Sequence, residues 1–113
     1  MKRPTILITE EDETLRQNLK EGLLRHGFEV IEASEKTEAL QSIRNRSPTL
    51  AIIGSSPNGR WDGLAVAKQI RQHDRKLPII LIVRQSSEAR VLAALRAGVN
   101  DYFMILFSTE EVM

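Results

Sequence analysis

The sequence contains no cysteine, only 4% aromatic residues and no long apolar run. The absence of cysteine excludes disulfides, thiol catalysis and zinc–thiolate sites. No apolar stretch approaches the roughly 18 to 20 residues that a membrane-spanning helix requires. The apolar segment Ile6–Ile8 is also too short for the core of a secretory signal. We therefore expect a cytoplasmic protein that does not enter a membrane.

Neither basic nor acidic residues are in large excess: the sequence has 16 basic and 15 acidic residues, which give a formal net charge of +1. This balance gives no support to nucleic-acid binding by the domain alone. The chain has 113 residues, of which 42% are hydrophobic and 27% charged. These values are typical of a single globular domain, which we expect to span residues 1–113.

Short aliphatic runs alternate with segments of helical periodicity. The runs predict five strands, at residues 5–9, 28–33, 50–53, 77–83 and 101–106. Between them, apolar residues recur at helical spacing and predict four helices, beginning near Glu13, at Ser34, before Leu64 and at Ser86 or Ser87. This order predicts an α/β fold whose parallel sheet carries helices on both faces and whose functional crevice lies at the carboxyl ends of the strands.

Two local features carry more specific expectations. We expect the fourth helix to turn four apolar side chains inward, namely Val91, Leu92, Ala94 and Leu95. At the end of the chain, Ser108 and Glu111 have the spacing of a capping box, which predicts a helix that the residues up to Met113 are too few to complete. This second feature predicts that the chain is the N-terminal fragment of a longer protein.

Six stretches in this order resemble the receiver domain of bacterial response regulators, the CheY-like fold. They are ILITEEDETLR at 6–16, HGFEVIEAS at 26–34, SPTLAII at 47–53, WDGL at 61–64, LPIILI at 77–82 and AGVNDYF at 97–103. The resemblance implies a doubly wound, flavodoxin-like sheet of five parallel strands in the order 2-1-3-4-5, with the last helix truncated. It also implies a non-enzymatic signal-transduction module of a two-component phosphorelay.

Receivers of this family accept a phosphoryl group on an aspartate at the end of the third strand, beside a divalent metal held by two acidic residues. A serine or threonine after the fourth strand and a lysine after the fifth contact the phosphoryl oxygens. The resemblance aligns these last three positions with Gly54, Val83 and Ile105. Glycine has no carboxylate to act as nucleophile. The alignment therefore implies a pseudo-receiver that has lost its phosphoacceptor and works independently of phosphorylation.

The acidic pair of the family aligns with Glu10 and Glu11, which begin the run Glu10–Glu13. One interpretation is a residual Mg²⁺ site. The other is the amino end of a helix, where acidic side chains complement the helix dipole. We favour the second, because the third carboxylate is missing and Mg²⁺ requires several oxygen ligands. We accordingly expect no cofactor.

The resemblance also implies a partner-binding face on the fourth helix and the fifth strand. The residues of that face are Arg84, Arg90, Arg96, Asp101 and Tyr102, of which Tyr102 matches an aromatic switch position of the family. A solvated, unoccupied helix surface is the alternative interpretation. The expected partners are proteins, including a second copy of the chain, and an output domain beyond residue 113 of the kind that often binds DNA.

Two other functions remain open from the sequence. In the first, the receiver keeps metal or phosphoryl chemistry through non-standard residues, namely Glu10, Glu11 and either Ser55 or Asp62. In the second, the chain is a sensor that binds a small ligand in the crevice above Gly54, between the apolar side chains of Val83 and Ile105.

Overall fold

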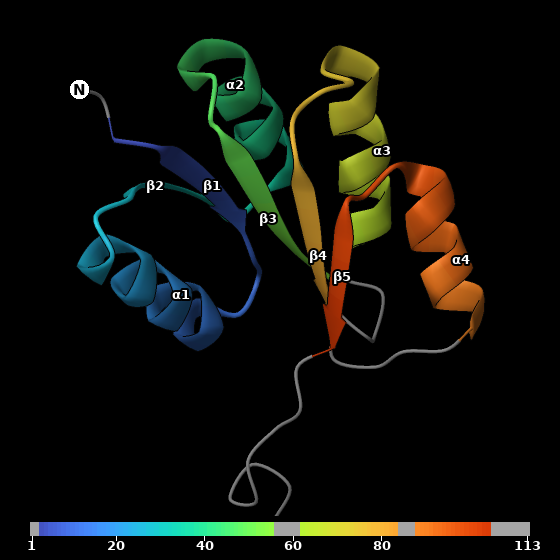
Figure 1. Cartoon of the computed structure of the whole chain (residues 1–113), viewed down its shortest axis with the longest axis horizontal. Coiled ribbons are helices and arrows are strands. Elements are labelled where there is room, and N and C mark those ends of the chain that lie inside the picture. Colours follow the sequence, from blue (N-terminus) through green and yellow to red (C-terminus); the bar gives the residue numbers. More distant parts are fainter. Residues whose placement is uncertain (1–2, 56–61, 84–87, 105–113) are drawn as a thin grey trace, which may run out of the picture.

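The computed structural model of the protein describes residues 3–55, 62–83 and 88–104. Its five strands are β1 (Thr5–Thr9), β2 (Glu29–Ala33), β3 (Leu50–Ser55), β4 (Ile79–Val83) and β5 (Asp101–Met104). Its helices are α1 (Glu13–Arg25), α2 (Lys36–Arg46), α3 (Gly63–His73) and α4 (Glu88–Ala97). All paired strands are parallel and their order is β2-β1-β3-β4-β5, which confirms the predicted sheet (Figure 1). The predicted last helix lies outside the described residues.

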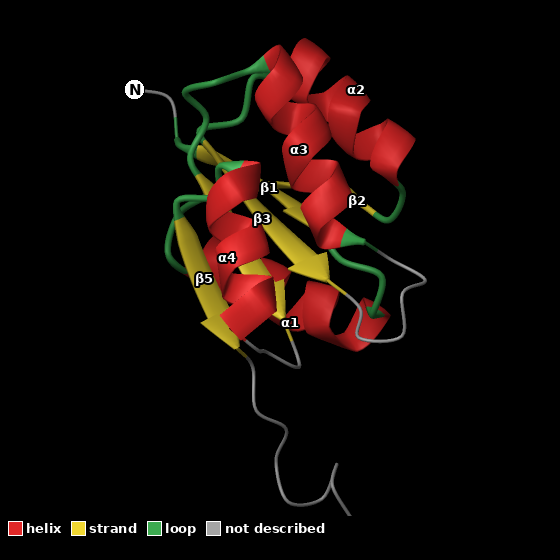
Figure 2. Ribbon diagram, turned by 90° about the vertical axis from the view of Figure 1, so that its right-hand side faces the viewer, coloured by secondary structure: helices red, strands yellow, loops and turns green. Residues whose placement is uncertain are grey.

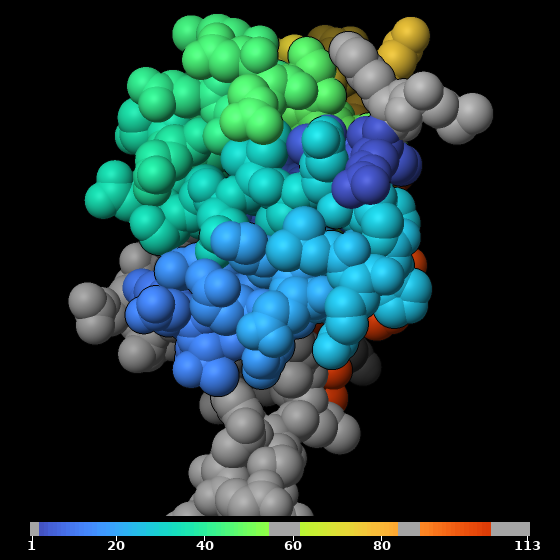
Figure 3. Space-filling model, turned by 90° about the vertical axis from the view of Figure 1, so that its left-hand side faces the viewer, coloured from blue at the N-terminus to red at the C-terminus, as the bar shows by residue number. Residues whose placement is uncertain are grey.

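Helices cover both faces of the sheet. Helices α2, α3 and α4 lie on one face and α1 lies on the other (Figure 2). Figure 3 shows the side of the molecule on which the surface of α1 adjoins the β2 segment. None of the helices in the described part of the chain has both the length and the apolar character needed to cross a lipid bilayer.

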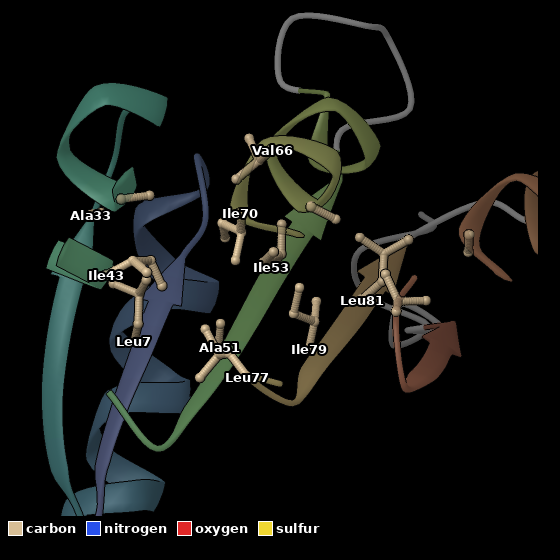
Figure 4. Close-up of a cluster of buried hydrophobic side chains, with 14 of the residues drawn as sticks. Leu7, Ala33, Ile43, Ala51, Ile53, Val66, Ile70, Leu77, Ile79 and Leu81 are labelled. Carbon is tan, nitrogen blue, oxygen red and sulfur yellow. The ribbon is translucent and has the colours of Figure 1, made fainter. Parts of the chain in front are cut away.

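The core is divided by the sheet into two clusters of aliphatic side chains. The larger one lies under α2, α3 and α4 and includes Leu7, Ala51 and Ile79 (Figure 4). The smaller one lies under α1 and includes Ile6, Ile8, Ile52 and Ile82. Adjacent residues of β1 therefore enter opposite clusters, which explains why this strand is apolar throughout rather than alternating.

The predicted starts of α1 and α3 agree with the structure, and the start predicted at Ser86 or Ser87 lies outside the described residues. Asp12 caps α1 by accepting a hydrogen bond from the Leu15 backbone N–H at 3.0 Å. Gly27 follows α1 at a φ of 86°, which favours glycine. The predicted cap at Ser34 is wrong by one residue, because Glu35 is the N-cap of α2 and makes no side-chain capping bond. Ser34 instead donates from its backbone N and its Oγ to Oε1 of Glu38.

The structure corrects the predicted end of the third strand. Strand β3 continues to Ser55, two residues beyond the predicted end at Ile53. Gly54 and Ser55 pair in register with Ile82 and Val83 of β4. Glycine weakens a strand only modestly, and pairing with a neighbouring aliphatic strand outweighs its low propensity.

The predicted inward face of α4 is largely wrong. Only Ala94 is buried, whereas Val91, Leu92 and Leu95 are 37%, 50% and 64% exposed. The segment from Val91 to Ala97 is apolar on nearly every side, so its periodicity does not specify which side packs. The face that packs is formed by Ala94 and Ala97, whose small side chains let α4 approach the rest of the fold closely.

The buried hydroxyl of Thr9 allows the stability of the core to be tested by substitution. Thr9 is fully buried, and its Oγ1 has no hydrogen-bond partner among the described residues. Replacing the hydroxyl with a methyl group in Thr9→Val removes an unpaired buried polar group. We expect the free energy of unfolding to rise by about 1 kcal/mol in urea denaturation. The exposed Thr49→Val is the control and should change it little. A loss of stability in Thr9→Val would contradict this view of the core.

Candidate functional site

Three predicted site positions meet at the carboxyl edge of the sheet. Glu10 follows β1 directly, Gly54 lies near the end of β3, and Val83 ends β4. Strand β3 pairs with both β1 and β4, with Thr9 opposite Ile53 and Gly54 opposite Ile82. The strand register therefore places the three positions side by side.

Glu10 turns its side chain into the protein at this edge. It is only 7% exposed, and its Oε2 accepts a hydrogen bond from the Asp12 backbone N–H at 2.7 Å. Its own carbonyl oxygen accepts a hydrogen bond from Nη1 of Arg16, also at 2.7 Å. Both the backbone and the carboxylate of Glu10 are thus held by neighbours on the loop and on α1.

The carboxylate of Glu10 lies against Gly54. A Cβ atom built on Gly54 would lie 2.7 Å from Cδ of Glu10 and nearer still to its Oε1, which is closer than real Cβ contacts allow. The side chain of Glu10 therefore takes the volume that the first atom of any side chain at position 54 would need. This contact depends both on the length of glutamate and on the missing side chain of glycine.

The remaining acidic residues of the run diverge from Glu10. Glu11 is exposed to solvent, and Asp12 is the N-cap of α1. Within residues 3–55, 62–83 and 88–104, no three histidine, aspartate or glutamate side chains are grouped so that they could hold a metal ion. Asp12 of this run thus serves the amino end of α1.

Three side chains of α1 donate hydrogen bonds to a carboxylate of the edge strand β2, near the site. The carboxylate of Glu32 accepts hydrogen bonds from Arg16 Nε at 3.2 Å, Gln17 Nε2 at 2.9 Å and Lys20 Nζ at 2.8 Å. The hydrogen bond from Lys20 is the main cause that lowers the pKa of Glu32, while partial burial acts in the opposite direction. Arg16 therefore bridges β2 and the backbone of Glu10.

Sequence reasoning did not identify this network. The available signal was weak: a glutamate inside an apolar strand pattern, and Arg16 and Lys20 four residues apart on the predicted helix. A local sequence pattern does not indicate which neighbouring helix is contacted by a glutamate in a strand.

A family model described as the response regulator receiver domain matches residues 6–113. The chain belongs to this family. Response regulator MprA of Mycobacterium sp. (strain KMS) is 33% identical to the receiver domain over 108 residues, which are 96% of this chain and 46% of that protein. Chemotaxis protein CheY1 of Helicobacter pylori (strain ATCC 700392 / 26695) is 32% identical over 108 residues, covering 93% of this chain and 87% of CheY1.

The receiver domain is also similar to solved structures. A putative response regulator from Chloroflexus aurantiacus J-10-fl superposes with a TM-score of 0.80 at 33% identity, covering 98% of this chain and 92% of that chain. A CheY-like receiver domain protein from Methanospirillum hungatei JF-1 shares the fold with a TM-score of 0.84 at 22% identity, covering 98% and 88%. The receiver domain thus spans about half the length of MprA but most of the single-domain relatives.

The family alignment can now be placed on the structure. Gly54 and Val83, which the resemblance predicts to stand at the acceptor and hydroxyl positions, are both buried at the edge that carries Glu10. Ile105, at the aligned lysine position, lies outside the described residues. The structure thus brings Glu10 against Gly54, with Val83 at the end of the adjoining strand, whereas Glu11 is exposed to solvent.

The predicted partner face is partly described. Val91, Leu95, Asp101 and Tyr102 line a groove of about 150 Å³ between α4 and β5. Tyr102 is half-buried and packs against the larger core cluster. Of the arginines, Arg90 is half-buried, Arg96 is exposed, and Arg84 lies outside the described residues.

The Glu32 network predicts a pH-dependent contribution to stability. At neutral pH, Glu32→Gln should lower the free energy of unfolding by about 1 kcal/mol, because three donors lose an anionic acceptor. The folded state lowers the pKa of Glu32 from its ordinary value of 4.5, so this stabilisation is present above that value and is lost as the pH falls through the lowered pKa.

Urea denaturation at neutral and acidic pH measures this effect. The stability difference between the natural protein and Glu32→Gln should shrink on acidification. The exposed Glu21→Gln, also on α1, is the control and should show no comparable change. A difference that stays constant or grows in acid would rule out the network as its source.

Proposed function

We propose that this receiver domain is a degenerate receiver that signals without phosphorylation, as a non-enzymatic module acting through protein contacts. The observation that carries the proposal is the contact of Glu10 with Gly54 at the aligned acceptor position. Phosphoryl transfer to a receiver needs a carboxylate nucleophile on β3. Here β3 carries a glycine at this position, and the side chain of Glu10, which follows β1, fills the adjoining space.

The other described position of the aligned set supports the same proposal. Val83 is 3% exposed and provides a methyl surface where a phosphoryl oxygen would need a hydroxyl donor. Mg²⁺ would need several oxygen ligands in octahedral geometry, whereas Glu10 is buried and Glu11 is exposed to solvent. An incoming phosphoryl group would thus meet an anionic carboxylate and an aliphatic side chain.

The mode of action is proposed from the α4–β5 face. Leu92, Leu95, Phe103 and Met104 are 50%, 64%, 52% and 47% exposed, and the groove beside Tyr102 adjoins this face. Exposed apolar side chains in such number favour a protein partner, including a second copy of the chain. MprA is about twice as long as the matched segment, so we extend the proposal to a longer regulator with an output domain beyond residue 113. DNA is a candidate target of that domain.

The two alternative functions meet specific obstacles in the described residues. Oδ1 of Asp62 accepts hydrogen bonds from the backbone N–H groups of Leu64 and Ala65, so the carboxylate serves as the N-cap of α3. The crevice above Gly54, which a small ligand would need, holds the Glu10 side chain. Phosphoryl chemistry on a non-standard residue remains a named outcome of the mass measurement described next.

The direct test is incubation with acetyl phosphate and Mg²⁺, followed by intact-mass spectrometry. We expect no added phosphoryl mass, because no carboxylate nucleophile is available on β3. A receiver with the usual aspartate, treated in parallel, must become modified. A stoichiometric adduct on this chain would overturn the proposal, and peptide mapping would then identify Ser55, Asp62 or a glutamate as the acceptor.

Signalling through protein contacts is tested by replacing an exposed apolar residue of the α4–β5 face with a charged one. Leu95→Lys should leave the fold intact, because Leu95 is 64% exposed, but should weaken self-association measured by sedimentation equilibrium. Leu24→Lys on α1 is the matched control, since Leu24 is also apolar and 48% exposed. A chain that is monomeric at all concentrations, or that responds equally to both substitutions, would contradict self-association through this face.

A further inference from the structure

We infer that the side chain of Glu10 determines whether position 54 can hold a phosphoryl-accepting side chain. The carboxylate from β1 closes the acceptor position against any side chain on β3, so that Glu10 and Gly54 form a matched pair. This inference rests on the proposed loss of phosphoryl transfer and goes further. It states that restoring an aspartate at position 54 alone does not restore an acceptor site, because Glu10 must be shortened as well.

Glu10 is held in place by two hydrogen bonds, one to its side chain and one to its backbone. A flexible side chain could swing away from a new Cβ at position 54 at little cost if nothing fixed it. Oε2 of Glu10, however, accepts the 2.7 Å hydrogen bond from the Asp12 backbone N–H, and Arg16 fixes the Glu10 backbone through its carbonyl oxygen. A side chain at position 54 therefore requires the Glu10 carboxylate to move although one of its oxygens is held by this hydrogen bond.

The electrostatic part adds to the steric one. An aspartate at position 54 would place a second carboxyl group directly against that of Glu10, at a site where Glu10 is only 7% exposed. Two carboxylates in contact away from bulk water disfavour the ionisation of one of them. The nucleophile in phosphoryl transfer is the ionised form, so the same contact that obstructs the aspartate also weakens it as a nucleophile.

A thermodynamic cycle on the chain tests the inference. Gly54→Asp is introduced into the natural protein, into Glu10→Gln and into Glu10→Ala, and the folding equilibrium constant of each is measured by urea denaturation. We expect Gly54→Asp to reduce this constant about tenfold more in the natural protein than in Glu10→Ala, as is found for residues in direct contact. Glu10→Gln keeps the size and removes the charge, so its value separates the steric part from the electrostatic part.

Gly22 supplies the matched control. It lies in α1, and a Cβ built there meets no atom within 4 Å, so Gly22→Asp should cost the same in all three backgrounds. If Gly54→Asp prevents folding of the natural protein, the same cycle is run with Gly54→Ala, which keeps the steric clash alone. Equal costs of the position 54 substitution in all three backgrounds, within twofold, would overturn the inference.

The cycle is independent of the proposed function. A phosphoryl adduct on the natural chain would overturn phosphorylation-independent signalling without altering the measured coupling between Glu10 and Gly54. Conversely, absence of coupling would show that Glu10 does not close position 54, and it would leave the proposed loss of the β3 nucleophile untouched.

Discussion

The parallel pairing of β3 with both β1 and β4 is the constraint on which the site depends. Parallel strands end at the same edge, so the residues that follow them converge whatever their chemistry. The observed register sets Thr9 beside Ile53 and Gly54 beside Ile82, and it therefore fixes Glu10 next to the end of β3. A shift of one residue would turn each side chain to the opposite face, and the two aliphatic clusters of the core exclude such a shift.

The same edge is stabilised from outside the sheet by polar contacts, because α1 contributes little buried surface of its own. No residue of α1 is fully buried, although its leucines pack partly against the smaller core cluster. The bonds of Glu32 to Arg16, Gln17 and Lys20 connect this helix to β2 in addition to its apolar contacts. Since Arg16 also binds the Glu10 carbonyl oxygen, the attachment of α1 and the position of Glu10 are set together.

The sheet and most helix boundaries could be predicted from the sequence, because aliphatic runs, caps and glycine stops are local signals. Burial in α4 could not, since Val91, Leu92 and Leu95 are as apolar as the residues that do pack. The end of β3 was missed for a related reason: Gly54 is a poor strand residue, and its pairing with β4 is a property of the whole sheet. At the site, the resemblance assigned Gly54 and Glu10 correctly to neighbouring strand ends. It gave no information on where the longer glutamate side chain points.

The direction of the Glu10 side chain connects the two proposed departures from the family pattern, at positions 10 and 54. In the proposed alignment, considered separately, a glycine for the acceptor aspartate would be a loss, and a glutamate for a metal-binding aspartate would be a small lengthening. Considered as one contact, the added methylene carries the β1 carboxylate into the space released on β3, and the edge keeps a carboxylate there instead of an empty cavity. A carboxyl group held by a backbone N–H can be accommodated in such a place, whereas a void would sacrifice packing and an unpaired carboxylate would cost solvation. The carboxyl group at this edge is thus supplied by the residue that follows β1.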